Sequence, residues 1–313
     1  MEKIIRSLHH VTATVSDAQE DLDFYLKVLG IRLVKKTVNF DNHNVYHFYY
    51  GDERGTPNTL MTTFPYRGWG VREGVQGAGQ VTVTAFSVPE GSLDSWRSRL
   101  RDANIDVRDV GERFGEEVIA FDDPSGLVIE LAANRNDERT PWVAGGVSAD
   151  HAVRGLYGIT MSIREPQRTL ALLTDVLNYE IVNEEDRRIR LAVNGNLPGH
   201  IIDVLHSPDA PDAVNGLGTV HHVAMAVADE DEQLRVRKEL INLGLEVTEV
   251  RDRCYFKSIY FREPGGVLYE VATLGPGFDV DEELSELGTH LRLPGWEEPN
   301  RAEIMQGLAT VSY

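Results

Sequence analysis

A fourfold repeat of turn residues constrains the fold of this chain more than any other feature of its sequence. Four helix-like segments each end on a Gly or Asn that is followed by an apolar or aromatic residue: Gly30, Asn104, Asn178 and Gly244. Both residue types tolerate the left-handed conformation that closes many helices. A proline turn follows each of these caps after 27, 20, 20 and 20 residues, at Pro57, Pro124, Pro198 and Pro264. We therefore expect four copies of one structural unit.

Each copy also has a strand-like segment before its cap: 9–15, 82–88, 157–163 and 221–227. The order predicts four βαβββ modules, each an incomplete curved sheet that must pair with another. We expect an α+β fold in which these modules pair into two open barrels. Along the chain we place one pair of modules at 1–134, a polar linker at 135–153, the second pair at 154–275 and an acidic tail at 276–313, with a helix near Pro299.

The modules differ at two equivalent positions. Counting from the caps and prolines, the first strands carry His10, Val83, Gly158 and His222, and the last strands carry Thr63, Glu130, Val204 and Glu270. Two imidazoles and one carboxylate (His10, His222, Glu270) form a 2-His-1-carboxylate set, which leaves coordination positions open and suits non-haem Fe(II), or Mn(II). Glu130 has no matching histidine and is interpreted as a structural or surface acid. Because ligands must converge on one ion, modules one and four should form the metal-bearing barrel, and modules two and three a metal-free partner.

Both histidines come in pairs, His9-His10 and His221-His222. Simple strand alternation sends the members of a pair to opposite faces. The face shared with His10 and His222 carries small residues such as Thr12 and Ala224, which leaves room for a ligand, whereas the other face is bulkier. Alternation would turn His9 and His221 away from the metal unless a bulge or strand end intervenes.

The pattern resembles the vicinal oxygen chelate superfamily, and most closely its hydroquinone-type ring-cleaving dioxygenases. The resemblance rests on His9-His10-Val11-Thr12, 36–40, 46–52, His221-His222-Val223 and the segment 252–270. It implies that His10, His222 and Glu270 hold iron. It also implies that His9, Thr12, His221, Arg253 and Tyr260 surround the metal or line the substrate pocket, although alternation puts Arg253 and Tyr260 on opposite faces.

Four of these five surrounding residues also have a simpler interpretation. Arg253 could belong to a surface ion pair, Tyr260 could be an aromatic residue of the barrel wall, and His9 or His221 could pack between modules. The single cysteine, Cys254, excludes an internal disulfide and is assigned no chemistry, because lone cysteines usually act as small buried hydrophobes.

The leading hypothesis is an Fe(II)-dependent dioxygenase that cleaves a hydroquinone-type ring, with O2 and a small aromatic as its partners. His221 or His9 would act as base, and Arg253 and Tyr260 would stabilise a developing oxyanion. One alternative is a glyoxalase-like metal-dependent isomerase or lyase; such sites use four protein ligands, and Thr63 would be a poor fourth. The other is a non-catalytic protein that binds a small molecule.

The charge balance narrows the partners. Fifty Asp and Glu against 31 Lys and Arg give a formal charge of -19, which opposes binding to nucleic acid or to an anionic membrane. No apolar run is long enough to span a bilayer, and the N-terminus (Met1, Glu2, Lys3) shows no signal segment, so we expect a cytoplasmic protein, which could form homo-oligomers. The chain has only six lysines but 25 arginines, and acidic residues outnumber basic ones. This composition indicates either adaptation to high salt or GC-rich codon bias.

Overall fold

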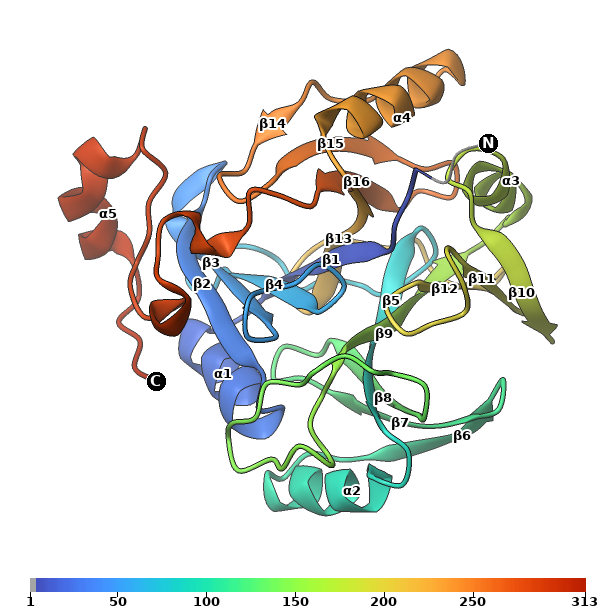
Figure 1. The fold of residues 1–313 in the computed structure, drawn as a ribbon, viewed down its shortest axis with the longest axis horizontal. Coiled ribbons are helices and arrows are strands. Elements are labelled where there is room, and N and C mark those ends of the chain that lie inside the picture. The colour runs from blue at the N-terminus through green and yellow to red at the C-terminus, as the bar shows by residue number, and fades with distance from the viewer. Residues whose placement is uncertain (1–3) are drawn as a thin grey trace.

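The computed structural model describes residues 4–313, so the N-terminal Met1, Glu2 and Lys3 lie outside the described residues. Two curled eight-stranded sheets lie side by side (Figure 1). The first contains β1 (Leu8–Val15), β2 (Arg32–Asn39), β3 (Asn42–Gly51), β4 (Leu60–Pro65), β13 (Thr219–Val227), β14 (Arg251–Asp252), β15 (Lys257–Arg262) and β16 (Leu268–Thr273). The second contains β5 (Gln80–Pro89), β6 (Arg108–Arg113), β7 (Glu116–Asp122), β8 (Val128–Asn134), β9 (Gly155–Ile163), β10 (Glu180–Glu185), β11 (Arg188–Ala192) and β12 (Ile201–His206).

The modules pair as predicted. The strand order of the first sheet is β14-β15-β16-β13-β1-β4-β3-β2, which joins modules one and four through the antiparallel pair β1 and β13. The second sheet joins modules two and three through β5 and β9 in the same way. Each sheet therefore contains strands from both halves of the chain. The segment 135–153 separates modules two and three along the sequence, but it does not separate the two sheets. That segment contains no helix or strand.

The helices begin and end close to where the turn residues placed them. They are α1 (Ala18–Asp23) followed by the short π-helix η1 (Phe24–Val28), α2 (Leu93–Asp102), α3 (Gln167–Asp175), α4 (Glu230–Asn242) and α5 (Arg301–Gly307), with the 3-10 helices η2 (Phe278–Val280), η3 (Leu284–Glu286) and η4 (Glu298–Asn300). All four predicted cap residues have positive φ: Gly30 at 72°, Asn104 at 58°, Asn178 at 59° and Gly244 at 81°. No helix among residues 4–313 is long and apolar enough to cross a membrane.

Alternation along the central strands decides what faces the core. Val11 and Val15 on β1, and Val223 and Val227 on β13, are fully buried in the main hydrophobic cluster. Their burial on the convex side of the sheet directs the alternate residues, His10 among them, into the concave side. The apolar face thus fixes the orientation of the polar one.

A β-bulge interrupts this alternation at the same place in all four modules. On β1 the register passes from Leu8 opposite Met225 to His10 opposite Ala224, which leaves His9 as the extra residue. The equivalent extra residues on the other first strands are Thr82, Tyr157 and His221. A bulge re-aims the side chain of the inserted residue. This is the irregularity that the sequence required if His9 and His221 were to reach the site.

The last strands correct two of the predicted equivalences. Glu270 lies opposite Ala224, and the corresponding pairs in the other modules are Thr62 opposite Thr12, Glu130 opposite Ala85 and Asp203 opposite Thr160. The predicted Thr63 and Val204 are therefore wrong by one residue. The reason is that the connection from the turn proline to the last strand is one residue shorter in modules one and three.

The acidic tail packs against the first sheet beside β2 and β3 (Figure 1). Nζ of Lys35 is completely buried and lies 2.5 Å from both Asp281 Oδ1 and Glu282 Oε2. Tyr255 donates a hydrogen bond to Asp281, and its ring stacks on Phe278. The tail is thereby anchored to the turn that precedes β15.

Candidate metal and substrate site

Three side chains converge in the cup of the first sheet. His10 on β1, His222 on β13 and Glu270 on β16 are all buried. Glu270 Oε2 lies 2.8 Å from His222 Nε2 and 3.3 Å from His10 Nε2, and the two Nε2 atoms are 3.3 Å apart. Ligands about 2.1 Å from one ion and at right angles to each other are about 3 Å apart, so the triangle has the size of a facial coordination set.

The chemistry of this donor set also fits a divalent cation. Burial lowers the pKa of His222, which keeps its imidazole neutral and able to donate a lone pair. Burial alone would raise the pKa of Glu270, but the two neighbouring imidazoles hold it well below its usual range. Glu270 Oε1 accepts a hydrogen bond from Ser258, whereas the buried Oε2 faces only the Nε2 atoms of His10 and His222, which are the atoms that would themselves bind a metal. A bound cation would satisfy this oxygen.

The bulged histidines lie directly behind the two candidate histidine ligands. His9 Nδ1 is 2.9 Å from His10 Nδ1, and His221 Nδ1 is 2.8 Å from His222 Nδ1. Burial is the main cause that lowers the pKa of both His9 and His221 to about 3, so both rings are neutral. A ligand that coordinates through Nε2 must carry its proton on Nδ1, and the neutral partner accepts that proton in a hydrogen bond, which orients the ligand ring.

Arg253 and Tyr260 meet at the edge of the same cup. Arg253 Nε donates to Tyr260 Oη at 3.0 Å, and its NH2 group lies 3.2 Å from Asp41. Burial would lower the pKa of Arg253, but the neighbouring Tyr260 and Asp41 raise this pKa above its usual range. Burial raises the pKa of Tyr260, so its phenol keeps its proton. Simple alternation failed for this pair because β14 ends at Asp252, so that Arg253 lies in a turn rather than in the strand.

Thr12 takes part in a polar chain on the module-one side of the cup. Its Oγ1 is 2.8 Å from Thr62 Oγ1, which in turn is 3.0 Å from Nε2 of His47 on β3. The ring of His47 lies between Tyr49, at a centroid distance of 4.0 Å, and Phe64, at 4.3 Å. Burial lowers the pKa of His47 well below its usual value, so this ring is neutral as well.

A cavity of about 360 Å³ opens onto these groups. Its walls include His10, His222, Glu270, His221, Arg253, Tyr260, His47, Tyr49, Phe64 and Phe256. His9 lies behind this lining, where its ring packs on Phe256 at a centroid distance of 4.8 Å. A volume of this size lies in the normal range for small-molecule sites, and its aromatic walls with a few converging polar groups are typical of them.

Four residues of the site were not predicted from the sequence: His47, Tyr49, Thr62 and Phe256. A usable signal existed for the first two, because they stand two residues apart in the strand-like stretch 46–52 and so share one face. Cys254 adjoins the site in sequence, and burial raises the pKa of its thiol to about 11, which agrees with assigning it no chemistry.

Comparison with known proteins decides the family. Residues 7–131 and 150–271 match the model of the Glyoxalase/Bleomycin resistance protein/Dioxygenase superfamily. The chain belongs to this superfamily. Within it, glyoxalase I from Zea mays has the same fold, with a TM-score of 0.66 at 14% identity over 91% of this chain and 97% of that one. The predicted vicinal oxygen chelate fold and the resemblance are thereby confirmed.

Relatives within the superfamily that span nearly the whole chain are named as dioxygenases. The "putative ring-cleaving dioxygenase MhqO" of Bacillus subtilis is 42% identical over 98% of this chain and 97% of its own. Chlorohydroquinone/hydroquinone 1,2-dioxygenase of Sphingobium indicum is 33% identical over 96% and 95%. The crystal structure of a "putative dioxygenase" from Bacillus subtilis matches with a TM-score of 0.94 at 42% identity, over 99% of this chain and 98% of that one.

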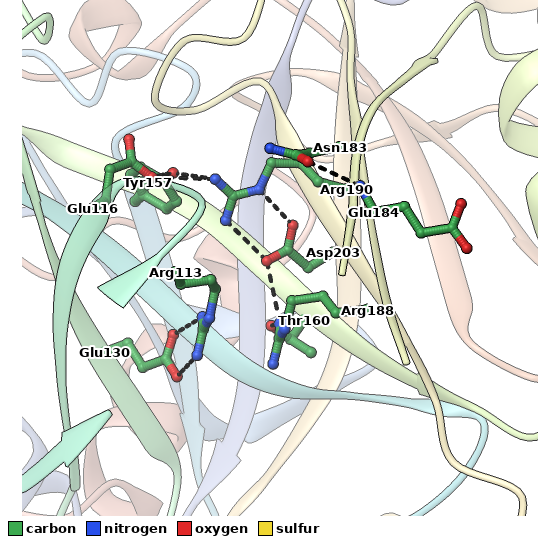
Figure 2. Close-up of polar contacts among 10 residues, drawn as sticks. All are labelled: Arg113, Glu116, Glu130, Tyr157, Thr160, Asn183, Glu184, Arg188, Arg190 and Asp203. Carbon is green, nitrogen blue, oxygen red and sulfur yellow. Dashed lines mark hydrogen bonds and ion pairs between the residues drawn. The ribbon is translucent and has the colours of Figure 1, made fainter. Parts of the chain in front are cut away.

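The second barrel of this superfamily member has its equivalent positions filled by ion pairs (Figure 2). Arg113 binds Glu130 through two contacts of 2.7 and 2.9 Å, and Arg190 binds Asp203 through two contacts of 2.8 and 3.0 Å. Arg188 adds a contact of 3.1 Å to Asp203. Both acids are buried and neutralised, which agrees with the interpretation of Glu130 as structural. Among residues 4–313, the first barrel alone holds a cluster suited to a metal.

Proposed function

We propose that this protein is a non-haem Fe(II)-dependent dioxygenase that opens the ring of a hydroquinone-type aromatic with O2 in the cytoplasm. The observation that carries the proposal is the triangle of His10, His222 and Glu270 in a cavity of about 360 Å³. Full-length relatives named as ring-cleaving dioxygenases, one of them acting on hydroquinones, support the reaction class. Mn(II) is the alternative metal for the same donor set.

Under this proposal His10, His222 and Glu270 hold the metal on one face. The bound metal would bring a phenolic oxygen and O2 together and mediate electron transfer between them. The protein's own groups then have to fix the ring, exclude water and stabilise charge on the substrate oxygens.

The two bulged histidines have different roles in this scheme. The Nδ1 atom of His9 faces His10 and its ring also hydrogen-bonds the backbone of Thr273, so neither nitrogen is free. His221 uses Nδ1 for His222, its side chain lines the cavity, and its Nε2 makes no hydrogen bond to any described residue. With Nδ1 accepting, Nε2 carries the proton. We therefore assign His9 to orienting His10, and His221 to donating a hydrogen bond to a substrate oxygen beside the triad rather than to taking its proton.

Arg253 and Tyr260 supply positive charge and a hydrogen-bond donor at the same cavity. Their mutual hydrogen bond and the contact of Arg253 with Asp41 hold the guanidinium in place before substrate arrives. Such preorganised donors stabilise an oxyanion that develops as the ring reacts, because they need no rearrangement at that moment.

The isomerase alternative is less well supported by the residues present. The position equivalent to Glu270 in module one holds Thr62, whose hydroxyl is engaged with Thr12 and His47. A site with three protein ligands and open positions favours dioxygen chemistry over the four-ligand sites of glyoxalase-type enzymes. A complete set of two imidazoles and one carboxylate, all buried and within 4.8 Å of one another, likewise argues against a binding protein without a metal.

Metal analysis of anaerobically purified protein tests the proposal. We expect about one iron per chain, and loss of both tight iron binding and activity in His10→Ala, His222→Ala and Glu270→Ala, because each removes a ligand. His290→Ala, which changes an exposed histidine, serves as the control and should keep both. A colourless zinc protein would favour the isomerase, and a wild-type protein without metal would favour the binding protein.

A further inference from the structure

The two halves of the metal-bearing barrel are related by their strand register. In module four, Tyr260 on β15 lies opposite Glu270 on β16. In module one, Tyr49 on β3 lies opposite Thr62 on β4. Tyr49 is therefore the module-one counterpart of Tyr260.

The residues two positions earlier correspond in the same way. Ser258 donates a hydrogen bond to Glu270, and the equivalent His47 lies 3.0 Å from Thr62 Oγ1 through Nε2. Module one thus repeats the arrangement with a hydroxyl in place of the carboxylate. This wall of the cavity supplies no candidate metal ligand from β3 or β4, so its polar groups are available for another task.

Two of these groups have hydrogen-bonding capacity that the protein does not use. Within residues 4–313, neither Tyr49 Oη nor His47 Nδ1 makes a hydrogen bond. Both side chains line the cavity, and neither atom belongs to the unpaired polar atoms that are sealed off from solvent. Tyr260 and Arg253, by contrast, already bond each other. Buried polar groups normally find a partner, so an unpaired pair that faces a cavity indicates a ligand.

The surrounding rings hold both groups in fixed positions. His47 lies between Tyr49 and Phe64, and Tyr49 packs on Phe278 of the tail at a centroid distance of 5.1 Å. If His47 donates from Nε2 to Thr62, then Nδ1 keeps its lone pair as an acceptor. Tyr49 offers an O–H donor. The wall therefore presents one acceptor and one donor, which is the complement of a hydroxyl group.

We propose that His47 and Tyr49 form the subsite for the substrate's second hydroxyl, the one not held at the triad. The inference rests on the proposed function. It names the residues that would distinguish a substrate with two hydroxyl groups from a phenol with one. The second hydroxyl donates to His47 Nδ1 and accepts from Tyr49 Oη. A substrate that lacks this group leaves both protein atoms unpaired, which lowers its affinity.

Anaerobic calorimetry on the metal-loaded enzyme tests the subsite without turnover. Hydroquinone and phenol serve as the two probes. We expect Tyr49→Phe to weaken hydroquinone binding about tenfold and to leave phenol binding unchanged, because the variant removes one hydrogen bond and keeps the ring. Tyr46→Phe is the matched control: Tyr46 lies on the same strand but outside the lining of this cavity, and its hydroxyl donates a hydrogen bond to the backbone oxygen of Ala309.

A second pair of variants separates the two nitrogens of His47. Asn places its amide near the position of Nδ1, and Gln places its amide near that of Nε2. His47→Gln keeps a group for Thr62 and should lose the preference for hydroquinone, whereas His47→Asn should retain more of it. If His47 serves only to support Thr62, the order of the two variants reverses.

The outcomes distinguish this inference from the proposed function. A wild-type preference for hydroquinone that persists in both Tyr49→Phe and His47→Gln overturns the subsite and leaves the dioxygenase proposal standing. A wild-type enzyme that binds phenol as tightly as hydroquinone overturns the subsite whether or not O2 is consumed. Absence of O2 uptake with any dihydroxybenzene overturns the proposed function itself.

Discussion

At the scale of single residues, Arg253 gains its place at the site from the end of a strand. It follows β14 directly and turns toward Tyr260, with Nε 3.0 Å from the phenol oxygen. Neither residue touches the candidate metal ligands through a hydrogen bond. Their contribution should therefore concern the substrate and not the metal.

Replacing Arg253 by Ala or Tyr260 by Phe should leave iron content unchanged and slow turnover about 10- to 100-fold. The reason is that each change removes a preorganised donor beside the substrate while the triad stays intact. Steady-state kcat/KM and metal content of the same preparation provide the measurement. Arg101→Ala, an exposed change on α2, should behave as wild type. Full activity of Arg253→Ala on every aromatic tested would remove it from the mechanism.

At the scale of structural elements, turn chemistry made the modules predictable. Gly30 and its three counterparts have the positive φ that their residue types indicated, and the repeat spacing revealed which modules carry histidine. The register of the last strands was less accessible, because one residue more or less after a proline turn shifts every later position. Thr63 and Val204 were wrong for that reason, while Glu270 was unaffected.

The bulges mark another limit of sequence reasoning. A period of two places His9 and His221 on the bulky face, and only strand pairing in three dimensions shows that both are inserted residues. His47 and Tyr49 were missed for a different reason. Their spacing shows that they share one face, but their strand reads as an ordinary aromatic core strand, and nothing local shows that this face borders a cavity rather than a helix.

The contact between β2 and the tail gives a prediction for an element. Lys35→Met removes the completely buried ammonium group that Asp281 and Glu282 share, and leaves Tyr255 as a donor to Asp281 and Arg292 at 3.6 Å from Glu282. We expect a loss of about 3–5 kcal/mol in the free energy of unfolding, measured by urea denaturation. Lys27→Met is the control, because the Lys27 side chain is 63% exposed and its pair with Asp23 should contribute about 0–1 kcal/mol. Equal effects of the two variants would contradict the anchoring role of the tail.

At the scale of the whole molecule, the site depends on both ends of the chain. His10 and His222 are 212 residues apart in sequence, and they meet only when β1 pairs with β13. The second barrel uses its buried charges differently, since arginines neutralise Glu130 and Asp203. Such enclosed pairs are little affected by salt, so the effect of ionic strength on stability should come from the acidic surface.

A net charge of -19 should make stability depend on salt if the composition reflects a saline cytoplasm. We expect the melting temperature to rise steeply between dilute buffer and molar KCl, because screening relieves repulsion within the chain. Thermal unfolding followed by circular dichroism across a KCl series provides the test. An unchanged or falling melting temperature would leave codon bias as the better account of the few lysines.

Oxygen consumption tests the central claim most directly. A facial triad leaves room for a bidentate catechol as well as a monodentate hydroquinone, so the metal does not select between them. Selection must come from groups that bond the far hydroxyl. With iron-loaded enzyme at high salt, we predict a higher kcat/KM for hydroquinones than for catechol and one O2 consumed per ring opened. Faster cleavage of catechol would contradict the hydroquinone assignment, and no O2 uptake with any dihydroxybenzene would contradict the account as a whole.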